Sequence, residues 1–369
     1  MDLKILGILK SFSTLIINFF FYIFTNKKII FFYFPRKDLT LKDLKYIKEL
    51  FSNLKSNFRI VIGHNVIDLN GDSLYYINQK IIPFLKCDLF ISNYLCYKFP
   101  KKIKKIYLHH CIYDTPLTGK KNESSTIKLL LNYDYIFLSS KHTIVSFKNL
   151  LEKYSNFKIK LLSSGYPRLD YLQKNLKKKS KEFCIVIALA NYKAYPDYTI
   201  VKSLPGIVEL ILKKFNYHIS LRPHPANREH FKKDRFKKIF DIIDNNKRVK
   251  LDLSDNYIET YSKSVLMITD ISGTAYTYSF LMNKPVIFFS NNEKLISKSH
   301  KNLNHFRDRK QIGKISNKIS NLNSDIKYIL RNSKSIKLKI KKLRSQRLDY
   351  HGKTKKRFAS LINQVINLD

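Results

Sequence analysis

The chain has 369 residues, which is too long for one ordinary hydrophobic core and predicts two domains of about 150 to 180 residues. Lys and Arg number 69 against 28 Asp and Glu, a net charge of +41 that favours anionic partners or reflects a bias toward lysine on solvated surfaces. The chain has no zinc-finger spacing, RNA-recognition motif or basic heptad region, so we expect no nucleic-acid partner.

The first predicted element, residues 1–28, is a strongly apolar helix. Its run from Leu15 to Phe24 lies between Lys10 and the Lys27-Lys28 pair. This run is short for a membrane span and has no small-residue cleavage site after it. Two interpretations stay open: an interfacial helix on the inner, cytoplasmic face of the cell membrane, with lysines meeting anionic lipid, or a buried first helix.

Residues 29–175 are predicted to form a first domain in which apolar strands alternate with amphipathic helices. This alternation is typical of a parallel sheet covered on both faces. The expected strands are residues 29–34, 58–63, 89–92, 106–109, 135–139 and 159–163, and the expected helices are residues 41–54 and 142–154.

A polar linker, residues 173–181, is expected before a second alternating series in residues 182–323. Basic helices are expected in residues 324–369. The strands of this domain are predicted at residues 183–188, 217–221, 249–253, 265–269 and 286–289, and its helices at residues 198–215, 228–243 and 256–262.

The fold class predicted is therefore α/β, with two doubly wound, Rossmann-like domains facing a cleft. Ligands of such sheets bind at the carboxyl ends of the strands. The candidate site residues all follow predicted strands. The four cysteines, Cys87, Cys96, Cys111 and Cys184, show no metal-ligand spacing, so we expect reduced thiols and neither a metal nor a cofactor.

In the first domain, the segment Y-L-H-H-C-I-Y-D-T-P-L follows a strand. Either His109 or His110 is a candidate general base, with Asp114 orienting it. The segment S-S-G-Y-P-R-L-D closes the domain. Its Arg168 and Asp170 are candidates for a contact that fixes a hinge, and Arg168 alternatively for phosphate contact across the cleft.

In the second domain, L-R-P-H-P places Arg222 and His224 at a strand tip between two prolines. Arg222 is a candidate ligand of a diphosphate, and His224 of a leaving phosphate. The segment T-D-I-S-G-T then joins a strand to a helix. Its candidate phosphate-binding residues, at or beside the helix N-terminus, are Asp270, Ser272, Gly273 and Thr274.

The motifs S-G-Y-P-R-L-D, L-R-P-H-P, T-D-I-S-G-T-A-Y-T-Y-S-F and K-P-V-I-F-F, in this order, resemble the CDP-glycerol glycerophosphotransferase family of teichoic-acid primases and polymerases. The resemblance implies a GT-B fold, a CDP-linked donor in the second domain and peripheral attachment to the membrane. In this chain the family's two histidines correspond to His109 or His110 and to His224. The family's acidic residue one turn into the helix is replaced by Thr277.

The sequence thus predicts a transferase that moves glycerol phosphate, or a related polyol phosphate, from a CDP-linked donor to a polymer or lipid-linked acceptor of the cell surface. The alternative is a GT-B glycosyltransferase that uses a nucleotide sugar in capsule or lipopolysaccharide synthesis. A third interpretation is a non-catalytic protein whose binding to membrane or nucleic acid depends on charge alone.

Overall fold

The computed structural model describes residues 3–35, 41–66, 74–113, 120–154, 157–176, 182–234, 236–255, 257–300 and 303–367. The chain divides into two compact units. Unit 1 comprises Met1–Tyr171 and Arg347–Asp369, and unit 2 comprises Leu172–Gln346.

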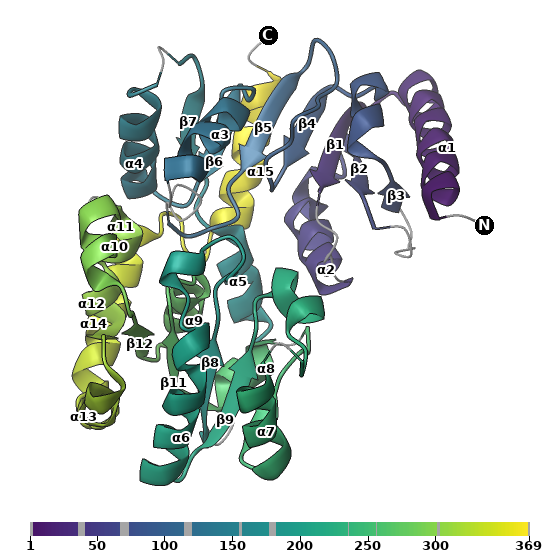
Figure 1. Cartoon of the computed structure of the whole chain (residues 1–369). Coiled ribbons are helices and arrows are strands. Elements are labelled where there is room, and N and C mark those ends of the chain that lie inside the picture. Colours follow the sequence, from purple (N-terminus) through teal and green to yellow (C-terminus); the bar gives the residue numbers. More distant parts are fainter. Residues whose placement is uncertain are drawn as a thin grey trace. The chain divides into compact units, whose positions relative to one another are not determined.

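Unit 1 is built on a seven-stranded parallel sheet with the strand order β3-β2-β1-β4-β5-β6-β7 (Figure 1). The middle strands are apolar on both faces because helices cover both sides of the sheet. The strands are β1 (Lys28–Phe34), β2 (Phe58–His64), β3 (Leu74–Tyr76), β4 (Leu89–Ser92), β5 (Lys104–Leu108), β6 (Tyr135–Leu138) and β7 (Lys160–Ser163).

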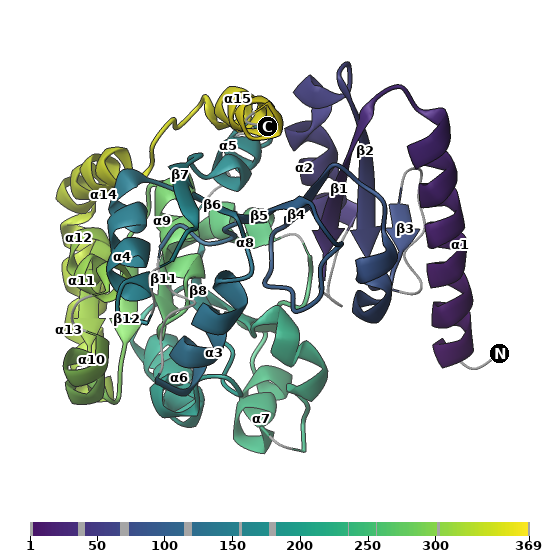
Figure 2. The same cartoon turned by 90° about the horizontal axis from the view of Figure 1, so that it is seen from above.

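The helices of unit 1 include the last one of the chain. Phe358, Leu361, Ile362 and Val365 share one face of α15 and are buried in the same core as Phe51. In Figure 2, α1 runs beside β3 at one edge of the sheet. The helices are α1 (Leu3–Phe24), α2 (Leu41–Leu50), α3 (Lys120–Leu130), α4 (Lys141–Leu151), α5 (Pro167–Lys174), which leads into unit 2, and α15 (Thr354–Ile366), with short 3-10 helices η1 (Ser52–Leu54) and η2 (Gln79–Phe84).

Unit 2 has a six-stranded parallel sheet with the order β10-β9-β8-β11-β12-β13. The strands are β8 (Cys184–Ala188), β9 (His218–Arg222), β10 (Val249–Leu251), β11 (Ser264–Thr269), β12 (Val286–Phe289) and β13 (Gly313–Ser316). The direction of winding reverses between β8 and β11, and this is the place where doubly wound sheets bind ligands.

The helices of unit 2 cover the sheet, and α9 among them is buried along most of its length. They are α6 (Leu204–Lys214), α7 (Lys237–Asn245), α8 (Tyr257–Lys263), α9 (Thr274–Met282), α10 (Glu293–His300), α11 (Asn304–Arg307), α12 (Arg309–Ile312), α13 (Ile319–Arg331) and α14 (Ser333–Arg347), with 3-10 helices η4 (Pro196–Tyr198), η5 (Val201–Ser203) and η6 (Pro225–His230).

The predicted domain limits need one correction. Residues 324–369 do not stand apart as basic helices, because α13 and most of α14 belong to unit 2 whereas α15 completes the core of unit 1. The apolar face of α15 accounts for this division, because its burial stabilises the core of unit 1. Much of the predicted linker, residues 177–181, lies outside the described residues.

Candidate functional site

Asp270 lies at the reversal point of the unit 2 sheet. It directly follows β11, and its Oδ1 accepts a hydrogen bond from the backbone N–H of Ala190, two residues past β8, at 2.9 Å. The carboxyl group is buried, and burial raises its pKa to about 7 against the lowering effect of the backbone N–H groups around it. Asp270 thereby ties together the two loops that border the expected ligand position.

The N-terminus of α9 lies directly beyond Asp270. Gly273 is the N-cap, and no side chain caps this end of the helix. The first N–H groups of a helix have no partners within the helix, so this end carries a partial positive charge. Thr274 and Thr277 are half-exposed one turn apart, whereas Ser272 is buried. Ser272, Gly273 and Thr274 therefore lie at this helix end, and their contact with an anion remains a prediction.

The hydroxyl of Thr274 is positioned by α8. Its Oγ1 lies 2.7 Å from the Oη of Tyr261, a buried residue whose ring packs edge-on against Tyr278. Burial raises the pKa of Tyr261 to about 12, so the phenol stays protonated. This contact with α8 therefore fixes the first turn of α9.

His224 follows β9 and is the N-cap of η6. Its Nδ1 accepts a hydrogen bond from the backbone N–H of Ala226 at 3.1 Å, and the ring is half-exposed. A neutral imidazole that accepts through Nδ1 carries its proton on Nε2. The turn therefore presents His224 as a hydrogen-bond donor through Nε2.

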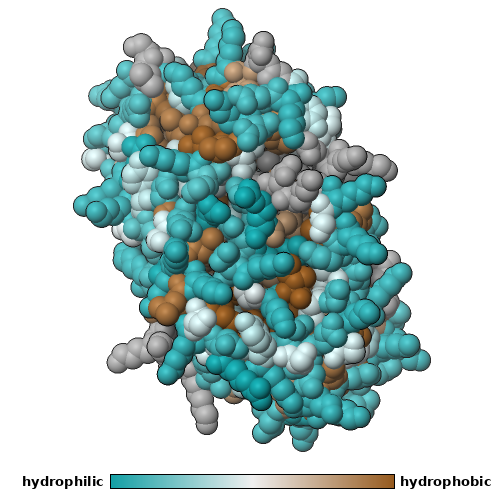
Figure 3. Space-filling view, turned by 90° about the vertical axis from the view of Figure 1, so that its left-hand side faces the viewer, coloured by the Kyte–Doolittle hydropathy of each residue, from teal (hydrophilic) through white to brown (hydrophobic). Residues whose placement is uncertain are grey.

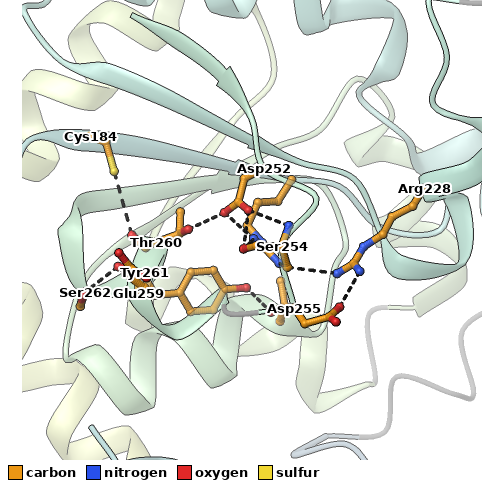
Figure 4. Close-up of polar contacts among 11 residues, drawn as sticks. Cys184, Arg228, Asp252, Ser254, Asp255, Glu259, Thr260, Tyr261 and Ser262 are labelled. Atoms are coloured by element: carbon orange, nitrogen blue, oxygen red, sulfur yellow. Dashed lines mark hydrogen bonds and ion pairs between the residues drawn. The ribbon is translucent and has the colours of Figure 1, made fainter. Parts of the chain in front are cut away.

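Arg222 is the buried cation at the tip of β9. It forms an ion pair with Asp252, the residue after β10, and its Nη2 donates to the backbone carbonyl of Ser254 at 2.7 Å. Figure 4 shows Asp252 at the centre of these contacts, with Ser254 and Thr260 hydrogen-bonded to the same carboxylate. The guanidinium therefore already has a carboxylate partner, and its contact with a diphosphate remains a prediction.

The charge of Asp252 is strongly favoured in this network. Although burial alone raises the pKa of its carboxyl group, hydrogen bonds from Ser254, Thr260 and Arg222 lower the pKa to about 2. Sequence reasoning missed Asp252 because 30 positions separate it from Arg222. The strand register would have found it. Leu221 of β9 pairs with Leu251 of β10, so the next residues, Arg222 and Asp252, are neighbours.

The second ion pair at this edge is more exposed. Arg228 donates from Nη1 to Oδ1 of Asp255 at 2.8 Å and from Nη2 to the carbonyl of Ser254 at 3.3 Å (Figure 4). It too lies outside the residues predicted from sequence. The two pairs link the end of β9 and η6 to the loop after β10.

In unit 1 the structure separates the two candidate histidines. His109 is buried between the rings of Tyr107 and Phe147, and burial lowers its pKa to about 3. His110 is half-exposed and stacks on Tyr94 with ring centroids 4.1 Å apart. Its Nδ1 lies 3.2 Å from the Oη of Tyr107. Asp114, the predicted orienting residue, lies outside the described residues.

The S-S-G-Y-P-R-L-D segment positions His110 and the end of the sheet. Tyr166 donates from its hydroxyl to the carbonyl of His110 at 3.0 Å. Gly165 has a φ of +73°, and a side chain there would lie 2.5 Å from the carbonyl oxygen of Asp349. Ser163 donates to the carboxylate of Asp349 at 2.7 Å. This segment is therefore fastened to the chain that leads into α15.

The two charged residues of this segment each bind partners elsewhere in unit 1. Arg168 binds Asp43 on α2 at 3.0 Å, and Asp170 accepts from Thr354 at 2.6 Å and pairs with His351 at 2.9 Å. Burial alone raises the pKa of Asp170, but hydrogen bonds from His351 and Thr354 lower it below its usual value. Both residues thus brace unit 1 internally.

No group of three or more His, Cys, Asp or Glu side chains among the described residues is placed to hold a metal ion. The four cysteines are free thiols; Cys87, Cys96 and Cys184 are buried, and Cys111 is half-buried.

Comparisons with known proteins agree with this layout. The family described as LIC12162 family transferase matches residues 207–306, which contain β9, β11 and the N-terminus of α9. No curated protein matches the chain in sequence. Solved structures resemble it over nearly the whole length. One is the wall teichoic acid polymerase TagF, at 17% identity and a TM-score of 0.65, with 97% of both chains covered.

Two sugar-nucleotide epimerases are similar to the chain as well. A putative UDP-N-acetylglucosamine 2-epimerase from Listeria monocytogenes is 13% identical with a TM-score of 0.62, covering 94% of this chain and 98% of that one. The UDP-GlcNAc 2-epimerase of Methanocaldococcus jannaschii is 14% identical with a TM-score of 0.61, covering 91% and 99%. These likenesses confirm the predicted fold of two doubly wound α/β domains.

Proposed function

We propose that the protein is a transferase that moves glycerol phosphate, or a related polyol phosphate, from a CDP-linked donor to a polymer or lipid-linked acceptor. The observation that carries the proposal is the carboxyl edge of the unit 2 sheet. There the uncapped N-terminus of α9 follows β11, and His224, with its Nε2–H, follows β9 of the same sheet.

Both groups suit a diphosphate. The first N–H groups of α9 and the hydroxyl of Thr274 donate hydrogen bonds, and a helix N-terminus stabilises negative charge. His224 adds a donor whose ring orientation is fixed by the N–H of Ala226. Donors fixed before the reaction stabilise the charge that appears on a leaving phosphate without reorganising.

For the general base we propose His110 rather than His109. A base must reach the acceptor hydroxyl and exchange its proton, and the buried His109 with its lowered pKa is poorly placed for both. His110 is half-exposed. If its Nδ1–H donates to the hydroxyl of Tyr107, its Nε2 is the unprotonated nitrogen that accepts a proton.

The proposed step is a single displacement. His110 takes the proton of the acceptor hydroxyl, and the hydroxyl oxygen forms a bond to the phosphorus that carries the glycerol. The bond from that phosphorus to the oxygen bridging to CMP breaks, and CMP leaves with the electron pair. The N-terminus of α9 and His224 stabilise the charge on the departing phosphate.

A second candidate function is a GT-B glycosyltransferase with a nucleotide-sugar donor. Thr277 favours it, because this half-exposed position one turn into α9 lacks the carboxylate expected there from the resemblance to the glycerophosphotransferases. The fold is also shared with an epimerase whose structure contains UDP-GlcNAc and UDP.

A thermal-shift comparison separates the two. Purified protein is heated with CDP-glycerol, CMP, UDP-GlcNAc or UDP, and a ligand at about 100 times its Kd adds about 2.7 kcal/mol to the free energy of unfolding. We expect CDP-glycerol to raise the melting temperature more than the UDP compounds do. A shift with UDP-GlcNAc but none with CDP-glycerol selects the glycosyltransferase, and no shift with any nucleotide overturns both.

A further inference from the structure

The N-terminal helix α1 is amphipathic in the reverse sense: its polar stripe faces the protein and its apolar side chains face outward. The buried positions Gly7, Ser11, Thr14 and Asn18 recur at the spacing of one helix face. The remaining surface carries more than half of the exposed large apolar side chains of the described residues, namely Ile5, Ile8, Leu9, Phe12, Ile16, Ile17, Phe19, Phe20, Tyr22, Ile23 and Phe24.

Hydrogen bonds from the polar stripe hold α1 on unit 1. Ser11 accepts from the backbone N–H of Asn78 at 3.0 Å, and Thr14 donates to the carbonyl of Tyr76 at 2.6 Å. Asn18 bonds both backbone groups of Lys86, at 2.9 and 2.8 Å. Gly7 permits the close approach, since a side chain there would lie 2.9 Å from the hydroxyl of Tyr76. The helix is therefore fixed to the β3 to η2 segment.

A further exposed ring follows in the chain. Phe84 at the end of η2 has 69% of its surface exposed and lies two residues before Lys86, which Asn18 of α1 binds. A contiguous apolar surface of this kind marks a contact with a membrane or a protein. By contrast, the surface of unit 2 around α13 and α14 is mostly hydrophilic with scattered apolar side chains (Figure 3).

The charges around this surface indicate which partner it fits. Residues 3–37 contain no Asp or Glu, and Lys27, Lys28 and Lys86 are exposed beside the apolar face. Positive charge next to apolar and aromatic side chains suits a bilayer with anionic headgroups. A second copy of the chain would bring the same lysines against each other.

We propose that α1 is a fixed in-plane anchor whose apolar face enters the headgroup and acyl boundary of an anionic bilayer while its polar stripe stays bonded to unit 1. The helix is long and apolar enough to span a membrane by length and composition. Spanning would break the bonds of Ser11, Thr14 and Asn18 and leave their polar groups without partners in hydrocarbon, which is unfavourable. The structure thus favours lying on the membrane over crossing it.

The chain contains no Trp, so a single introduced Trp reports without background. Phe20→Trp places the probe on α1 at 53% exposure, and Tyr328→Trp on α13 of unit 2 is a control matched at 50%. Each full-length variant is mixed with phosphatidylcholine vesicles with or without phosphatidylglycerol. We expect a blue shift for Phe20→Trp with anionic vesicles, quenching by lipids brominated near the headgroups, and no change for Tyr328→Trp.

Quenching that is strongest at the bilayer centre would mean that α1 spans the membrane, and it would overturn the in-plane anchor. The absence of any blue shift with anionic vesicles would overturn it as well. A second variant, Phe12→Gln with Ile16→Gln, changes only exposed side chains and should lower vesicle binding at least about tenfold with an unchanged melting temperature. If the same variant instead abolishes a dimer seen by light scattering and leaves vesicle binding intact, the face is a contact between copies and the proposal fails.

Discussion

The carboxyl edges of the two sheets are built from different chemistry. In unit 2 the edge holds paired charges, Arg222 with Asp252 and Arg228 with Asp255, around an uncapped helix end. In unit 1 the part of the edge that follows β5 holds aromatic rings, with His110 stacked on Tyr94 and His109 buried beside Phe147. The unit 2 edge is therefore suited to stabilising a phosphate charge, and the end of β5 to moving a proton.

The largest effect is expected at His224, on the carboxyl edge of the unit 2 sheet. Replacing His224 with Ala removes the donor to the leaving phosphate and should lower kcat about a thousandfold, a typical size for a proton donor in catalysis. CMP release from CDP-glycerol measures it. His230→Ala, at an exposed position of the same short helix, is the control and should keep normal turnover. Normal turnover in His224→Ala removes His224 from the mechanism.

The next effect distinguishes the two histidines of the unit 1 edge. His110→Asn should lower kcat about a hundredfold because the base is lost. His109→Phe should leave kcat within about threefold, because a ring of similar shape fills the site between Tyr107 and Phe147. The same turnover assay applies. The reverse ranking of the two variants would falsify the assignment of the base to His110.

A stability difference tests the charge pairing of unit 2. Asp252→Asn leaves Arg222 buried without its carboxylate and should lower the free energy of unfolding by about 2 to 4 kcal/mol. The matched change Asp255→Asn affects a half-exposed pair and should cost less than about 1 kcal/mol. Denaturant unfolding monitored by circular dichroism measures both. Equal losses in the two variants mean that the Arg222 pair has no special role.

The smallest effect is the opposite pH dependence of the two edges. His109 has its pKa lowered from 6.5 to about 3 on folding, so its contribution to stability is present above pH 6.5 and is lost as pH falls below that value. Asp270 has its pKa raised from 3.8 to about 7, so its contribution is present below pH 3.8 and is lost as pH rises through about 7.

Unfolding of His109→Phe and Asp270→Asn between pH 4 and 7.5 checks these signs. As pH falls, the free energy of unfolding of the wild type should decrease relative to that of His109→Phe. It should increase relative to that of Asp270→Asn. If both differences between wild type and variant change in the same direction with pH, the opposite pH dependence of His109 and Asp270 is contradicted.

Much of the fold was predictable from sequence because buried parallel strands are continuous apolar runs. β4 and β12 begin and end where predicted, and the other predicted strands differ by a residue or two. β3 and β13 were missed because they are short, and β13, with the sequence G-K-I-S, contains a single large apolar residue.

The finer features depend on tertiary contacts that no local pattern reveals. An apolar helix such as α1 is expected to bury its apolar face, and its reversal depends on partners at Tyr76, Asn78 and Lys86, more than 60 residues away. The pairing of Arg222 with Asp252 required the register of β9 and β10. The motif residues themselves were correctly placed at strand ends, because parallel strands put the residues that follow them on one edge.

The central claim is that the carboxyl edge of unit 2 holds the nucleotide-linked donor. Amide hydrogen exchange of the whole protein, measured with and without CDP-glycerol, tests it most directly. We expect slower exchange in residues 222–230 and 270–277. We expect no change around Lys284 at the opposite end of the sheet, where backbone carbonyls bind its ammonium. Saturating donor that leaves residues 270–277 unprotected, or that protects only the segment around Lys284, contradicts it.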